Sequence, residues 1–505
     1  MAEATLTKGN IKQSKKRDKL YAPQIPSPLE GLPHVIAVNP LFDRTKYVWD
    51  SRGIRRLFAD AFINVCKYVP ERKGWHTYDG KIWVYDSGNI AVQKYAMDLI
   101  DHLMDYRKYL TDENERKMWV EFVYKHMGRK AREAFIMDAA SEGMEISINE
   151  FDKNYWILNC ENCTIDLKSR KMWQHRPEDM LTMVTKVSFA KGAKCERWER
   201  FMTEVMLGHD EKIGFLQRSL GYALTGDISY DCLFMLLGLK TRNGKGTTME
   251  TIKHMLGDYA ANMQPDTLAQ KQFASGGAPS EDIARLRGKR LVVVPEPEKG
   301  MRLNSAIVKQ LTGGDTVTAR KLNENSFEYR PQFKLFIHTN HKPIVKDDSL
   351  FASGRVKLIT FERHFEESER DIGLREYFRQ PANLSGILNW CIDGLRTLGK
   401  EGLKQPTAVV EATNEYREES NPIGQFIGEC LVSVTGAKTL YKSVFAEYEK
   451  WCDAWGFGAL NSRNLAAELR TKGVVIKAAD KNQLYVFGYG IATDSVQGEL
   501  DDCPF

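Results

Sequence analysis

The chain contains 505 residues, which is too long for one ordinary hydrophobic core, so its length indicates roughly two to four domains. Lys plus Arg number 72 against 67 Asp plus Glu, and this small excess neither requires nor excludes a polyanionic partner. The sequence has no run of about 18 apolar residues and no apolar stretch behind its basic start, which argues against export and membrane insertion and favours a cytoplasmic protein without a membrane partner.

The first half of the chain predicts an arm followed by an α+β domain. Residues 1–31 mix Lys, Ser, Gln and Pro and predict a flexible basic arm, either solvated or in contact with DNA. Residues 32–194 predict a separate α+β domain. Its hairpin "GWHTYDGKIWVYD" turns at Asp79-Gly80, helical segments such as "ERKMWVEFVYKHM" follow, and "LNCENCTIDLKSRKMWQHRPED" forms a small β unit.

Cysteine usage favours a reducing compartment. Nine Cys, an odd number scattered along the chain, do not form a disulfide framework. Cys160 and Cys163 have the spacing of half a zinc site, but no second closely spaced Cys/His pair completes four ligands. We therefore favour a structural role for this pair over a metal or redox role.

Residues 195–380 predict an α/β nucleotide-binding core with preceding helices. The apolar runs "CLFMLLG", "RLVVVPEPE", "FKLFIHTN" and "RVKLITFE" alternate with helical segments, which is typical of such a core. Residues 381–490 predict a helical linker followed by the order helix, helix, strand, strand, which suits a winged helix. Residues 491–505 form a tail.

The loop in "MLLGLKTRNGKGTTME" resembles a phosphate-binding loop, although its spacing is unusual. Five residues separate Gly238 from Gly244, and Lys245 is followed by Gly246 instead of Ser or Thr. A strand that leads through such a loop into a helix places backbone N–H groups around a phosphate. The predicted nucleotide-binding residues are Gly238, Thr241, Arg242, Asn243, Gly244, Lys245, Gly246, Thr247 and Thr248. The alternative is a plain glycine-rich turn.

Lys245 is the expected phosphate ligand within this loop. Because Gly246 lacks a hydroxyl, Thr247 becomes the candidate Mg²⁺ ligand, directly or through water.

Three further polar residues lie at the ends of later apolar runs. Glu296 follows "LVVVP" and would order the metal and the attacking water, with Glu298 as an alternative acid. Asn340 follows "LFIHT" and could touch the γ-phosphate and the water. Arg355 precedes "VKLITF" and could act as an arginine finger on a neighbouring subunit. Taken singly, these residues also fit a polar loop, a turn and a salt bridge.

The order of these motifs closely resembles the superfamily 3 helicase core of the phage and plasmid primase-helicase proteins, which are related to the poxvirus helicase-primase. The resemblance rests on "LLGLKTRNGKGTTME", "LRGKRLVVVPEPEKG", "FKLFIHTNHKP" and "DDSLFASGRVKLITFERHF". "LNCENCTIDL" and "FLQRSLGYALTG" extend it upstream and "LYKSVFAEYEKWC" downstream, so that it covers residues 45–490.

This resemblance implies an α/β fold with an AAA+-like P-loop ATPase core, an N-terminal α+β domain and a C-terminal winged-helix domain. It makes Lys245, Glu296 and Asn340 catalytic within one subunit and Arg355 catalytic across a ring, with ATP and Mg²⁺ as cofactors. Thr247 and Glu296 are the expected metal-binding residues. The long phosphate loop and the missing Asp before Glu296 depart from the usual pattern.

The resemblance also implies contacts with DNA. The segment "TARKLNENSFEYRP" corresponds to a hairpin that grips single-stranded DNA, and its Arg320 and Lys321 would neutralise phosphates. In the expected winged helix, the segment "NSRNLAAELRTKG" is the candidate recognition helix, capped by Asn461 or Ser462, and its Arg463, Arg470 and Lys472 would face DNA phosphates. An exposed charged hairpin and a protein-binding winged helix are the alternatives.

These expectations describe a ring-forming helicase, a hexamer, that translocates on single-stranded DNA and opens a DNA fork during replication of a phage or mobile element. We expect other replication proteins as partners of this helicase, and we expect it to act in the cytoplasm of a bacterial host. Primase catalysis is not expected, because the first 200 residues show neither an acidic metal-binding pair nor a Cys/His cluster. Two alternatives are a replication initiator that uses ATP without strong unwinding and a nucleotide phosphotransferase.

Overall fold

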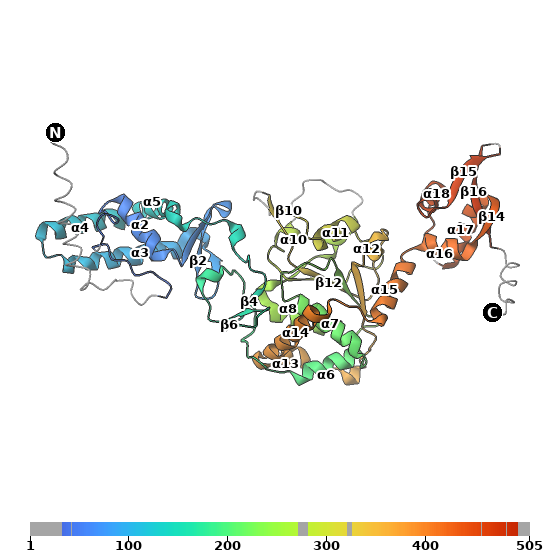
Figure 1. Cartoon of the computed structure of the whole chain (residues 1–505), viewed down its shortest axis with the longest axis horizontal. Helices are drawn as coiled ribbons and strands as arrows, with labels where there is room; N and C mark the ends of the chain where they lie inside the picture. The colour runs from blue at the N-terminus through green and yellow to red at the C-terminus, as the bar shows by residue number, and fades with distance from the viewer. Residues whose placement is uncertain are drawn as a thin grey trace.

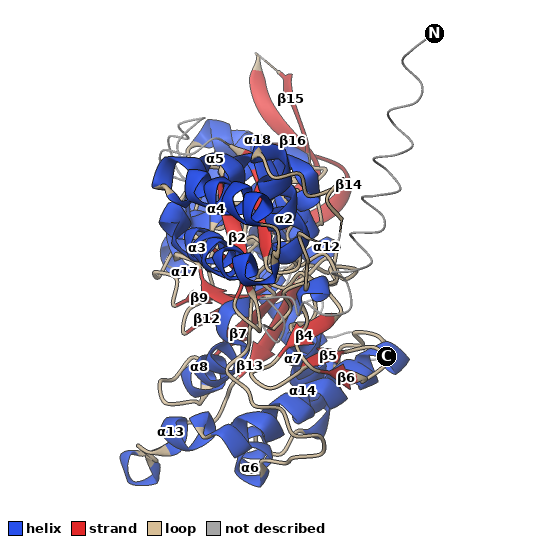
Figure 2. Ribbon diagram, turned by 90° about the vertical axis from the view of Figure 1, so that its left-hand side faces the viewer, coloured by secondary structure: helices blue, strands red, loops and turns tan. Residues whose placement is uncertain are grey.

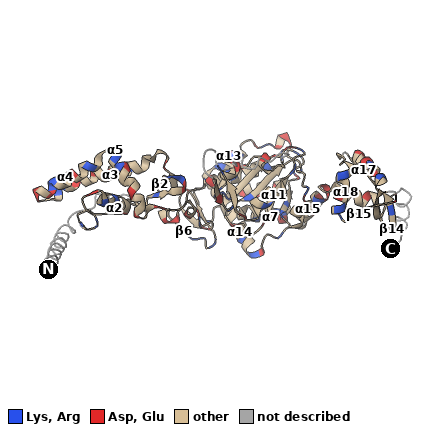
Figure 3. Ribbon diagram, turned by 90° about the horizontal axis from the view of Figure 1, so that it is seen from above, with Lys and Arg blue, Asp and Glu red and all other residues tan. Residues whose placement is uncertain are grey.

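The computed structural model describes residues 33–41, 43–270, 281–320, 326–455, 457–480 and 482–492. These residues form three units in a row, with a central sheet between an N-terminal and a C-terminal unit (Figure 1). Basic and acidic residues alternate along the whole row (Figure 3), so charge alone does not single out a functional surface. The predicted arm and most of the predicted tail lie outside the described residues.

The N-terminal unit combines four helices with an antiparallel sheet of order β1-β2-β3. Its elements are α2 (Ser51–Phe62), β1 (Cys66–Val69), β2 (Gly74–Tyr78), β3 (Trp83–Tyr85), α3 (Ile90–Asp105), α4 (Glu113–Met127) and α5 (Arg129–Ala139). The Asp50 carboxylate accepts from the first backbone amides of α2 and caps it. The predicted hairpin is confirmed, since β2 and β3 pair and the Asp79 carboxylate accepts from the amides of Lys81 and Ile82 at 2.8 Å.

A small antiparallel sheet connects this unit to the centre of the molecule. It consists of β4 (Ile157–Asn159), β5 (Thr164–Asp166) and β6 (Met172–Trp173), which confirms the predicted β unit. Its buried residues Leu158 and Ile165 pack in the same hydrophobic cluster as the central strands, whereas the N-terminal cluster ends at Phe151. The boundary between the N-terminal and the central hydrophobic cluster therefore lies between Phe151 and Leu158, well before residue 194.

The central unit is built on a five-stranded parallel sheet of order β13-β7-β12-β9-β8, whose strands lie side by side in Figure 2. The strands are β7 (Leu233–Leu237), β8 (Ala260–Asn262), β9 (Leu291–Pro295), β12 (Lys334–Thr339) and β13 (Val356–Thr360). All five residues of β7 are buried, as expected when helices cover both faces of a parallel sheet. The predicted α/β class of the core is thus confirmed, and the structure adds that its sheet is parallel.

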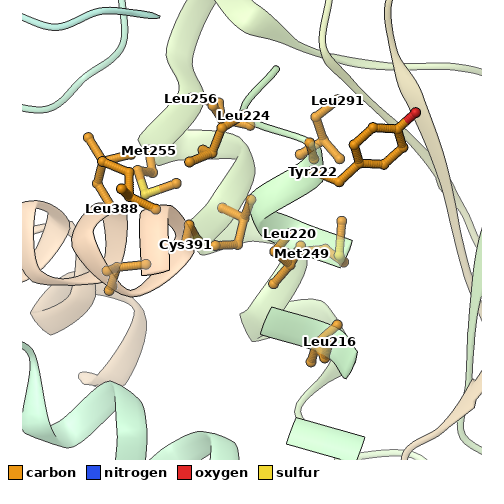
Figure 4. Close-up of a cluster of buried hydrophobic side chains, with 14 of the residues drawn as sticks. Leu216, Leu220, Tyr222, Leu224, Met249, Met255, Leu256, Leu291, Leu388 and Cys391 are labelled. Atoms are coloured by element: carbon orange, nitrogen blue, oxygen red, sulfur yellow. The ribbon is translucent and has the colours of Figure 1, made fainter. Parts of the chain in front are cut away.

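Alternate residues of β7 enter two different hydrophobic clusters. Phe234 and Leu236 pack with α7 (Asp210–Tyr222), α8 (Lys245–Leu256) and α14 (Pro381–Glu401). Figure 4 shows side chains of these three helices in one cluster with Leu291 of β9. Leu233 and Met235 pack with residues of α11 (Ser305–Thr312), α12 (Ser349–Ala352) and α15 (Thr407–Glu419) on the other face.

Glycines allow α7 and α14 to cross closely. A Cβ atom on Gly221 would lie 2.3 Å from the backbone nitrogen of Leu395, and one on Gly394 would lie 2.2 Å from the carbonyl oxygen of Gln217. Such distances are too short for any side chain. Helix α14 therefore packs as part of the central unit, although its sequence position predicts a linker.

Shorter elements complete the central unit. They are α6 (Glu196–Val205), α9 (Pro265–Leu268), α10 (Glu281–Ala284), β10 (Val317–Ala319), β11 (Phe327–Tyr329) and α13 (Leu374–Arg379). Strands β10 and β11 pair antiparallel and confirm the predicted hairpin. The residues at its tip, 321–325, lie outside the described part of the chain.

The C-terminal unit contains the predicted order of helix, helix and two strands. Its elements are α16 (Pro422–Cys430), β14 (Leu431–Leu440), α17 (Tyr441–Trp455), α18 (Ser462–Thr471), β15 (Val475–Ala479) and β16 (Gln483–Ile491). Strand β14, which the sequence analysis did not predict, pairs with β16 and carries a register shift between Ser433 and Lys438. Asn461, rather than Ser462, caps α18 through the amide of Asn464 at 2.9 Å. Over the described residues of all three units, no helix combines the length and apolarity of a membrane span.

Candidate functional site

The glycine-rich loop connects the end of β7 to the start of α8, as the sequence predicts. Gly244 has φ +85°, and a Cβ atom there would lie 2.3 Å from Cγ1 of Val205. At Gly238 a Cβ atom would lie 2.0 Å from Nδ2 of Asn243. A side chain at Gly238 would displace the ends of the Asn243 and Lys245 side chains, and Gly244 requires glycine for its backbone conformation.

Asn243 fixes the loop from within. It is buried, its Nδ2 donates to the carbonyl oxygen of Lys240 at 2.5 Å, and its Oδ1 accepts from the backbone amide of Lys245 at 3.4 Å. The chain then enters α8. The first backbone amides of this helix have no partners within it, and the helix dipole has its positive end here. The loop thus presents the elements of an anion-binding site.

Lys245, Asn340 and Glu296 form one hydrogen-bonded network. The Lys245 Nζ donates to the Gly238 carbonyl oxygen at 3.1 Å and to Asn340 Oδ1 at 2.9 Å. The Nδ2 of Asn340 donates to Glu296 Oε1 at 3.2 Å. These residues follow β7, β12 and β9, which are neighbours in the parallel sheet, so their carboxyl ends meet at one edge.

Glu296 adopts an uncommon backbone conformation at this edge. Its φ is +32°, which for a residue other than glycine costs about 1–3 kcal/mol. The backbone amide of Glu296 donates to the His338 carbonyl oxygen at 2.9 Å and holds it beside β12. Among the described residues, the side chain of Glu298 makes no hydrogen bond, so the network includes Glu296 and not the alternative acid.

Lys245 is the charged group most affected by this environment. Burial lowers the pKa of Lys245 to about 8, while the nearby Glu296 acts in the opposite direction. A lysine with a pKa in this range still carries its positive charge near neutrality. It can therefore attract an anion at pH 7 and lose that attraction under mildly alkaline conditions.

The two threonines after the loop differ in availability. The Thr248 hydroxyl is buried and donates to the Gly244 carbonyl oxygen at 3.0 Å, which is a contact inside the helix. Thr247 is half-buried, lines a cavity, and makes no side-chain hydrogen bond among the described residues. Thr247 is therefore the hydroxyl that remains available to a ligand.

The cavity next to Thr247 has a volume of about 610 Å³. Phe201, Phe365 and Leu374 give its wall an apolar part. Its charged part consists of Arg197, Arg242, Arg363, Arg370 and Arg375 together with Glu204, Glu369 and Asp371. Ion pairs join Arg197 to Glu204 at 3.2 Å and Arg363 to Glu369. Phe365, Arg363 and Arg375 were not among the predicted site residues. The available signal for the first two was the run "RHF", which directly follows the predicted strand "RVKLITFE".

The segment after β13 is bonded to the loop. The Nδ1 of His364 lies 2.7 Å from the Thr241 carbonyl oxygen, and the Phe365 amide donates to the Arg242 carbonyl oxygen at 2.9 Å. The Arg242 guanidinium also forms an ion pair with Glu367 at 2.7 Å. The loop and this later segment therefore form one continuous wall.

Arg355 lies at the other edge of the sheet, at the amino end of β13. Its Nη2 forms an ion pair with Asp231 at 2.9 Å, and its Nη1 donates to Thr312 Oγ1 at 2.8 Å. Within one chain, Arg355 is therefore separate from the Lys245 network. It makes a salt bridge, which was the predicted alternative to an arginine finger.

The predicted DNA-binding residues lie on two different units. Arg320 is exposed at the end of β10, and Lys321 lies outside the described residues. Arg463 and Arg470 are exposed on α18 and Lys472 directly follows it. Of the described residues, Arg320, Arg463, Arg470 and Lys472 make no contact with the Lys245 network.

The described residues contain no group of three or more His, Cys, Asp and Glu side chains placed to hold a metal ion. Cys160 and Cys163 are buried in the main hydrophobic cluster, and their backbones form a turn in which the Cys160 amide donates to the Cys163 carbonyl oxygen at 2.8 Å. Contact with Cys163 and burial together raise the pKa of the Cys160 thiol.

Fold and site together define a mixed α/β protein with a polar cluster and a glycine-rich loop at the carboxyl edge of a parallel sheet. Residues 53–207 match the family described as "D5 N terminal like", and residues 236–355 match a "Family of unknown function (DUF5906)". The match to this D5 family model and the similarity to viral proteins named as helicases and primases support the resemblance to the primase-helicase family found in the sequence.

Several viral proteins are similar to this chain. "Putative helicase L207/L206" of Acanthamoeba polyphaga mimivirus is 27% identical over 310 residues, which cover 58% of this chain and 32% of that protein. "Putative helicase 022R" of Frog virus 3 is 29% identical over 258 residues, covering 47% and 25%. "Putative primase C962R" of African swine fever virus is 24% identical over 230 residues, covering 42% and 24%. The matched part of this chain spans a third or less of each relative.

A solved structure shares the fold. "The A form apo structure of NrS-1 C terminal region-CTR(305-718)" superposes with a TM-score of 0.50 at 11% sequence identity, covering 84% of this chain and 96% of that chain. At this identity the likeness concerns the fold alone.

Proposed function

We propose that this protein is an ATP-driven DNA helicase of the D5-like family that works as a ring on single-stranded DNA during replication. The single observation that carries the proposal is the network of Lys245, Asn340 and Glu296 beside a glycine-rich loop. This arrangement supplies a phosphate ligand, an amide and a carboxylate at one edge of the sheet, which are the groups that nucleotide hydrolysis requires. The helicase and primase names of the viral relatives support the same direction.

The residues at this edge fit ATP. A side chain at Gly238 or Gly244 would clash with the loop or with α6, so the loop keeps a smooth backbone surface for phosphates. Lys245 would bind the outer phosphates, and Thr241, Arg242, Asn243, Gly246 and Thr248 would complete the loop. The apolar wall of the neighbouring cavity, with Phe201 and Phe365, suits a flat base, and Arg363 and Arg375 would add positive charge.

Thr247 and Glu296 are the residues that would hold Mg²⁺, together with phosphate oxygens and water, since Mg²⁺ commonly takes only one or two protein ligands. Bound Mg²⁺ would supply charge neutralisation on the phosphates. Glu296 would accept a hydrogen bond from the attacking water, and Asn340 would orient both the Glu296 carboxylate and the Lys245 ammonium. Its existing hydrogen bonds to both groups support this role.

The remaining predicted residues act between subunits and on DNA. Arg355 would reach the nucleotide of a neighbouring subunit in a hexameric ring, for which it must release Asp231. Arg320 and Lys321 on the β10–β11 hairpin would contact the phosphates of single-stranded DNA. Arg463, Arg470 and Lys472 would contact the DNA fork if the C-terminal unit is a winged helix.

DNA-stimulated phosphate release tests the proposal. The wild type is expected to hydrolyse ATP faster with single-stranded DNA and to unwind a forked duplex, whereas Lys245→Ala should lose at least about 100-fold in rate because its loop lacks the phosphate-binding charge.

The matched control is Lys253→Ala, on the same helix, whose ammonium forms an ion pair with Glu250 at 2.9 Å. This variant should retain wild-type activity. If Lys245→Ala and Lys253→Ala hydrolyse ATP equally well, the proposed site is wrong. Phosphate transfer that needs a nucleoside monophosphate acceptor would instead support a phosphotransferase.

A further inference from the structure

A second cavity lies between the N-terminal and central units, away from the glycine-rich loop. It has a volume of about 800 Å³ and we call it the basic cleft. One wall comes from the end of the 3₁₀ turn at Arg72, the β2–β3 hairpin and residues 148–155. The other wall comes from residues 284–289 and 329–332 of the central unit.

Positive charge predominates in the basic cleft. Its basic lining residues are Arg72, Lys153, Arg285, Arg287, Lys289 and Arg330. Its carboxylates are Asp152 and Asp258. Both acids already accept backbone hydrogen bonds, Asp152 from the Thr182 amide at 2.9 Å and Asp258 from the Val184 amide at 3.2 Å.

Several of these cations are held by neutral groups instead of carboxylates. Arg287 Nη2 donates to the Ile148 carbonyl oxygen at 3.0 Å and to Asn149 Oδ1 at 2.8 Å, and Arg330 Nε donates to the Gly314 carbonyl oxygen at 2.8 Å. Within the described part of the chain, Arg72, Arg287, Lys289 and Arg330 form no ion pair. The nearby carboxylates of Asp152 and Asp258 act on Arg287 and Lys289 only through space, so among the described residues no carboxylate occupies these cations directly.

The electrostatic cost of this arrangement is visible at Arg287. Burial, and then the neighbouring Arg72, lower the pKa of Arg287, while the carboxylates of Asp152 and Glu71 act in the opposite direction without reversing the shift. Burial likewise lowers the pKa of Lys289. A polyanion in the cleft would relieve the repulsion between Arg72 and Arg287.

Aromatic side chains line the same cleft. Tyr85 and Tyr155 are 48% and 36% exposed, so each presents a face to solvent. Behind Tyr85 lies His76, which is 6% exposed, has a ring centroid 5.4 Å from that of Tyr85, and has a buried Nδ1 without a hydrogen-bond partner. Exposed aromatic rings interleaved with Arg and Lys are the combination with which proteins bind single-stranded nucleic acid, by stacking bases and neutralising phosphates.

The basic cleft is continuous with the predicted DNA-binding hairpin. Tyr329, at the end of β11, lines the cleft and pairs with Val317 of β10, the strand that leads to Arg320. The paired part of the hairpin is three residues long, so the two ends are separated by roughly 10 Å, the length of a few nucleotides at most. A strand bound at Arg320 could therefore extend into the cleft.

We infer that the basic cleft between the N-terminal and central units is a second binding site for single-stranded DNA. Phosphates contact Arg72, Arg287 and Arg330, and bases stack on Tyr85 and Tyr155. The bound DNA would continue from the β10–β11 hairpin into the basic cleft. This part of the inference rests on the proposed function. Its recognition follows backbone charge and base stacking, so it does not depend on sequence.

The test measures binding of a fluorescein-labelled 20-nucleotide oligo(dT) by anisotropy, without nucleotide, over a series of salt concentrations. Arg72→Gln and Arg330→Gln are each expected to reduce the slope of log Kd against log salt by about 0.7, because each removes one phosphate contact. Tyr85→Ala and Tyr155→Ala are expected to weaken binding by about fivefold or more through lost stacking.

Two variants serve as controls. Arg129→Gln removes an exposed arginine on α5, where the side chain is 84% exposed and pairs with Glu133, and should leave Kd and slope unchanged. Lys245→Ala should bind the oligonucleotide like the wild type, because the glycine-rich loop does not line the cleft. Thermal melting of every variant verifies folding, and a photoreactive oligonucleotide should crosslink to peptides that contain Tyr85 or Tyr155.

The inference is overturned if the Arg72 and Arg330 variants match Arg129→Gln, or if an oligoglutamate peptide displaces the DNA at lower concentration than unlabelled oligo(dT). These outcomes leave the ATPase proposal standing. Conversely, cleft-dependent DNA binding by a protein that does not hydrolyse ATP would refute the helicase and retain the cleft.

Discussion

Cations lie at both ends of the central strands, which we call the carboxyl edge and the amino edge of the sheet. Only the carboxyl edge has the features of a ligand site. At the carboxyl edge, Lys245 contacts the amide oxygen of Asn340 and a carbonyl oxygen within a glycine-rich loop, next to a cavity. At the amino edge, Arg290, Lys334 and Arg355 precede or begin β9, β12 and β13. The comparison shows which partners make a buried cation structural and which leave it free to bind a ligand.

Backbone carbonyl groups hold two of the amino-edge cations, Arg290 and Lys334, whereas side chains of Asp231 and Thr312 hold Arg355. Arg290 donates to the Leu224 and Ile157 carbonyl oxygens at 2.7 and 2.6 Å, with its guanidinium 4.3 Å from the centre of the Tyr259 ring. Lys334 donates to the Asp227 carbonyl oxygen at 2.8 Å. These bonds tie the segment before β7 and the small β4–β6 sheet to the central strands, so they stabilise the fold.

A lowered pKa does not distinguish the two edges. Burial lowers the pKa of Lys334 and of Arg290 as it lowers that of Lys245. What differs is the surroundings: Lys245 has a neighbouring carboxylate, an amide and glycines that keep space open, whereas Arg290 is enclosed by carbonyl groups and an aromatic ring. The predictions below test this distinction, beginning with the largest effect.

The largest effect is expected at Arg355, the amino-edge residue with a proposed role in catalysis. Arg355→Ala should reduce ATP hydrolysis by about 10³-fold, as loss of an arginine finger does elsewhere. Mixing Arg355→Ala with Lys245→Ala should restore part of the activity, because some interfaces then combine an intact loop with an intact arginine. Steady-state phosphate release on the separate and mixed variants measures both effects.

The control for this experiment is Asp231→Asn, which removes the ion pair and retains the arginine. It is expected to hydrolyse ATP at close to the wild-type rate. If Asp231→Asn loses as much activity as Arg355→Ala, and mixing restores nothing, then Arg355 acts only through its salt bridge and belongs with Arg290 and Lys334.

The second prediction concerns stability at the amino edge. Arg290→Met should lower the free energy of unfolding by about 3 kcal/mol, because it leaves two buried carbonyl groups without donors. Arg379→Met, which breaks an ion pair with Glu376 on the surface, should cost less than about 0.5 kcal/mol. Urea denaturation measures both, and equal midpoints for the two variants would contradict a structural role for Arg290.

The third prediction is a pH dependence at the carboxyl edge. Burial lowers the pKa of Lys245 to about 8, so below this pH the free protein carries the charge that binds phosphate. Above it, ATP binding must be accompanied by proton uptake, and Kd for ATP should rise about tenfold per pH unit. Titrations between pH 7.5 and 9.5 measure this slope.

Lys245→Arg provides the comparison, because a guanidinium stays charged over this range. Its Kd should be independent of pH, whatever its absolute value. Lys253→Ala should follow the wild type. An equal slope in Lys245→Arg would assign the pH dependence to another group.

The smallest expected effect separates Thr247 from Thr248. Thr247→Ala should raise the Mg²⁺ concentration for half-maximal hydrolysis by about fivefold, the effect of losing one hydrogen bond or ligand contact. Thr248→Ala should leave this concentration unchanged, because the Thr248 hydroxyl is already bonded to the Gly244 carbonyl oxygen. The reverse order would assign the metal contact to Thr248.

The sequence by itself determined the α/β core, four of its five strands and the residues at their carboxyl ends. Each of these four strands is an apolar run, whereas the short strand β8 (Ala260–Asn262) is not and was missed. In a parallel sheet the polar residues that follow the runs meet at one edge. The connection of Lys245, Asn340 and Glu296 was therefore predictable from order along the chain. The family resemblance was also visible in the sequence, because each of its motifs is a short continuous segment.

Only the tertiary structure decided the rest. The sequence could not choose Glu296 over Glu298 as the acid of the network, because the choice depends on the backbone turn after β9 and on the reach of Asn340. Arg363, Phe365 and Arg375 join the cavity beside the glycine-rich loop, and Arg72, Arg287 and Tyr85 join the basic cleft, through packing between distant segments. Periodicity shows which side of an element is apolar, but which distant segment covers that side depends on how the whole chain packs.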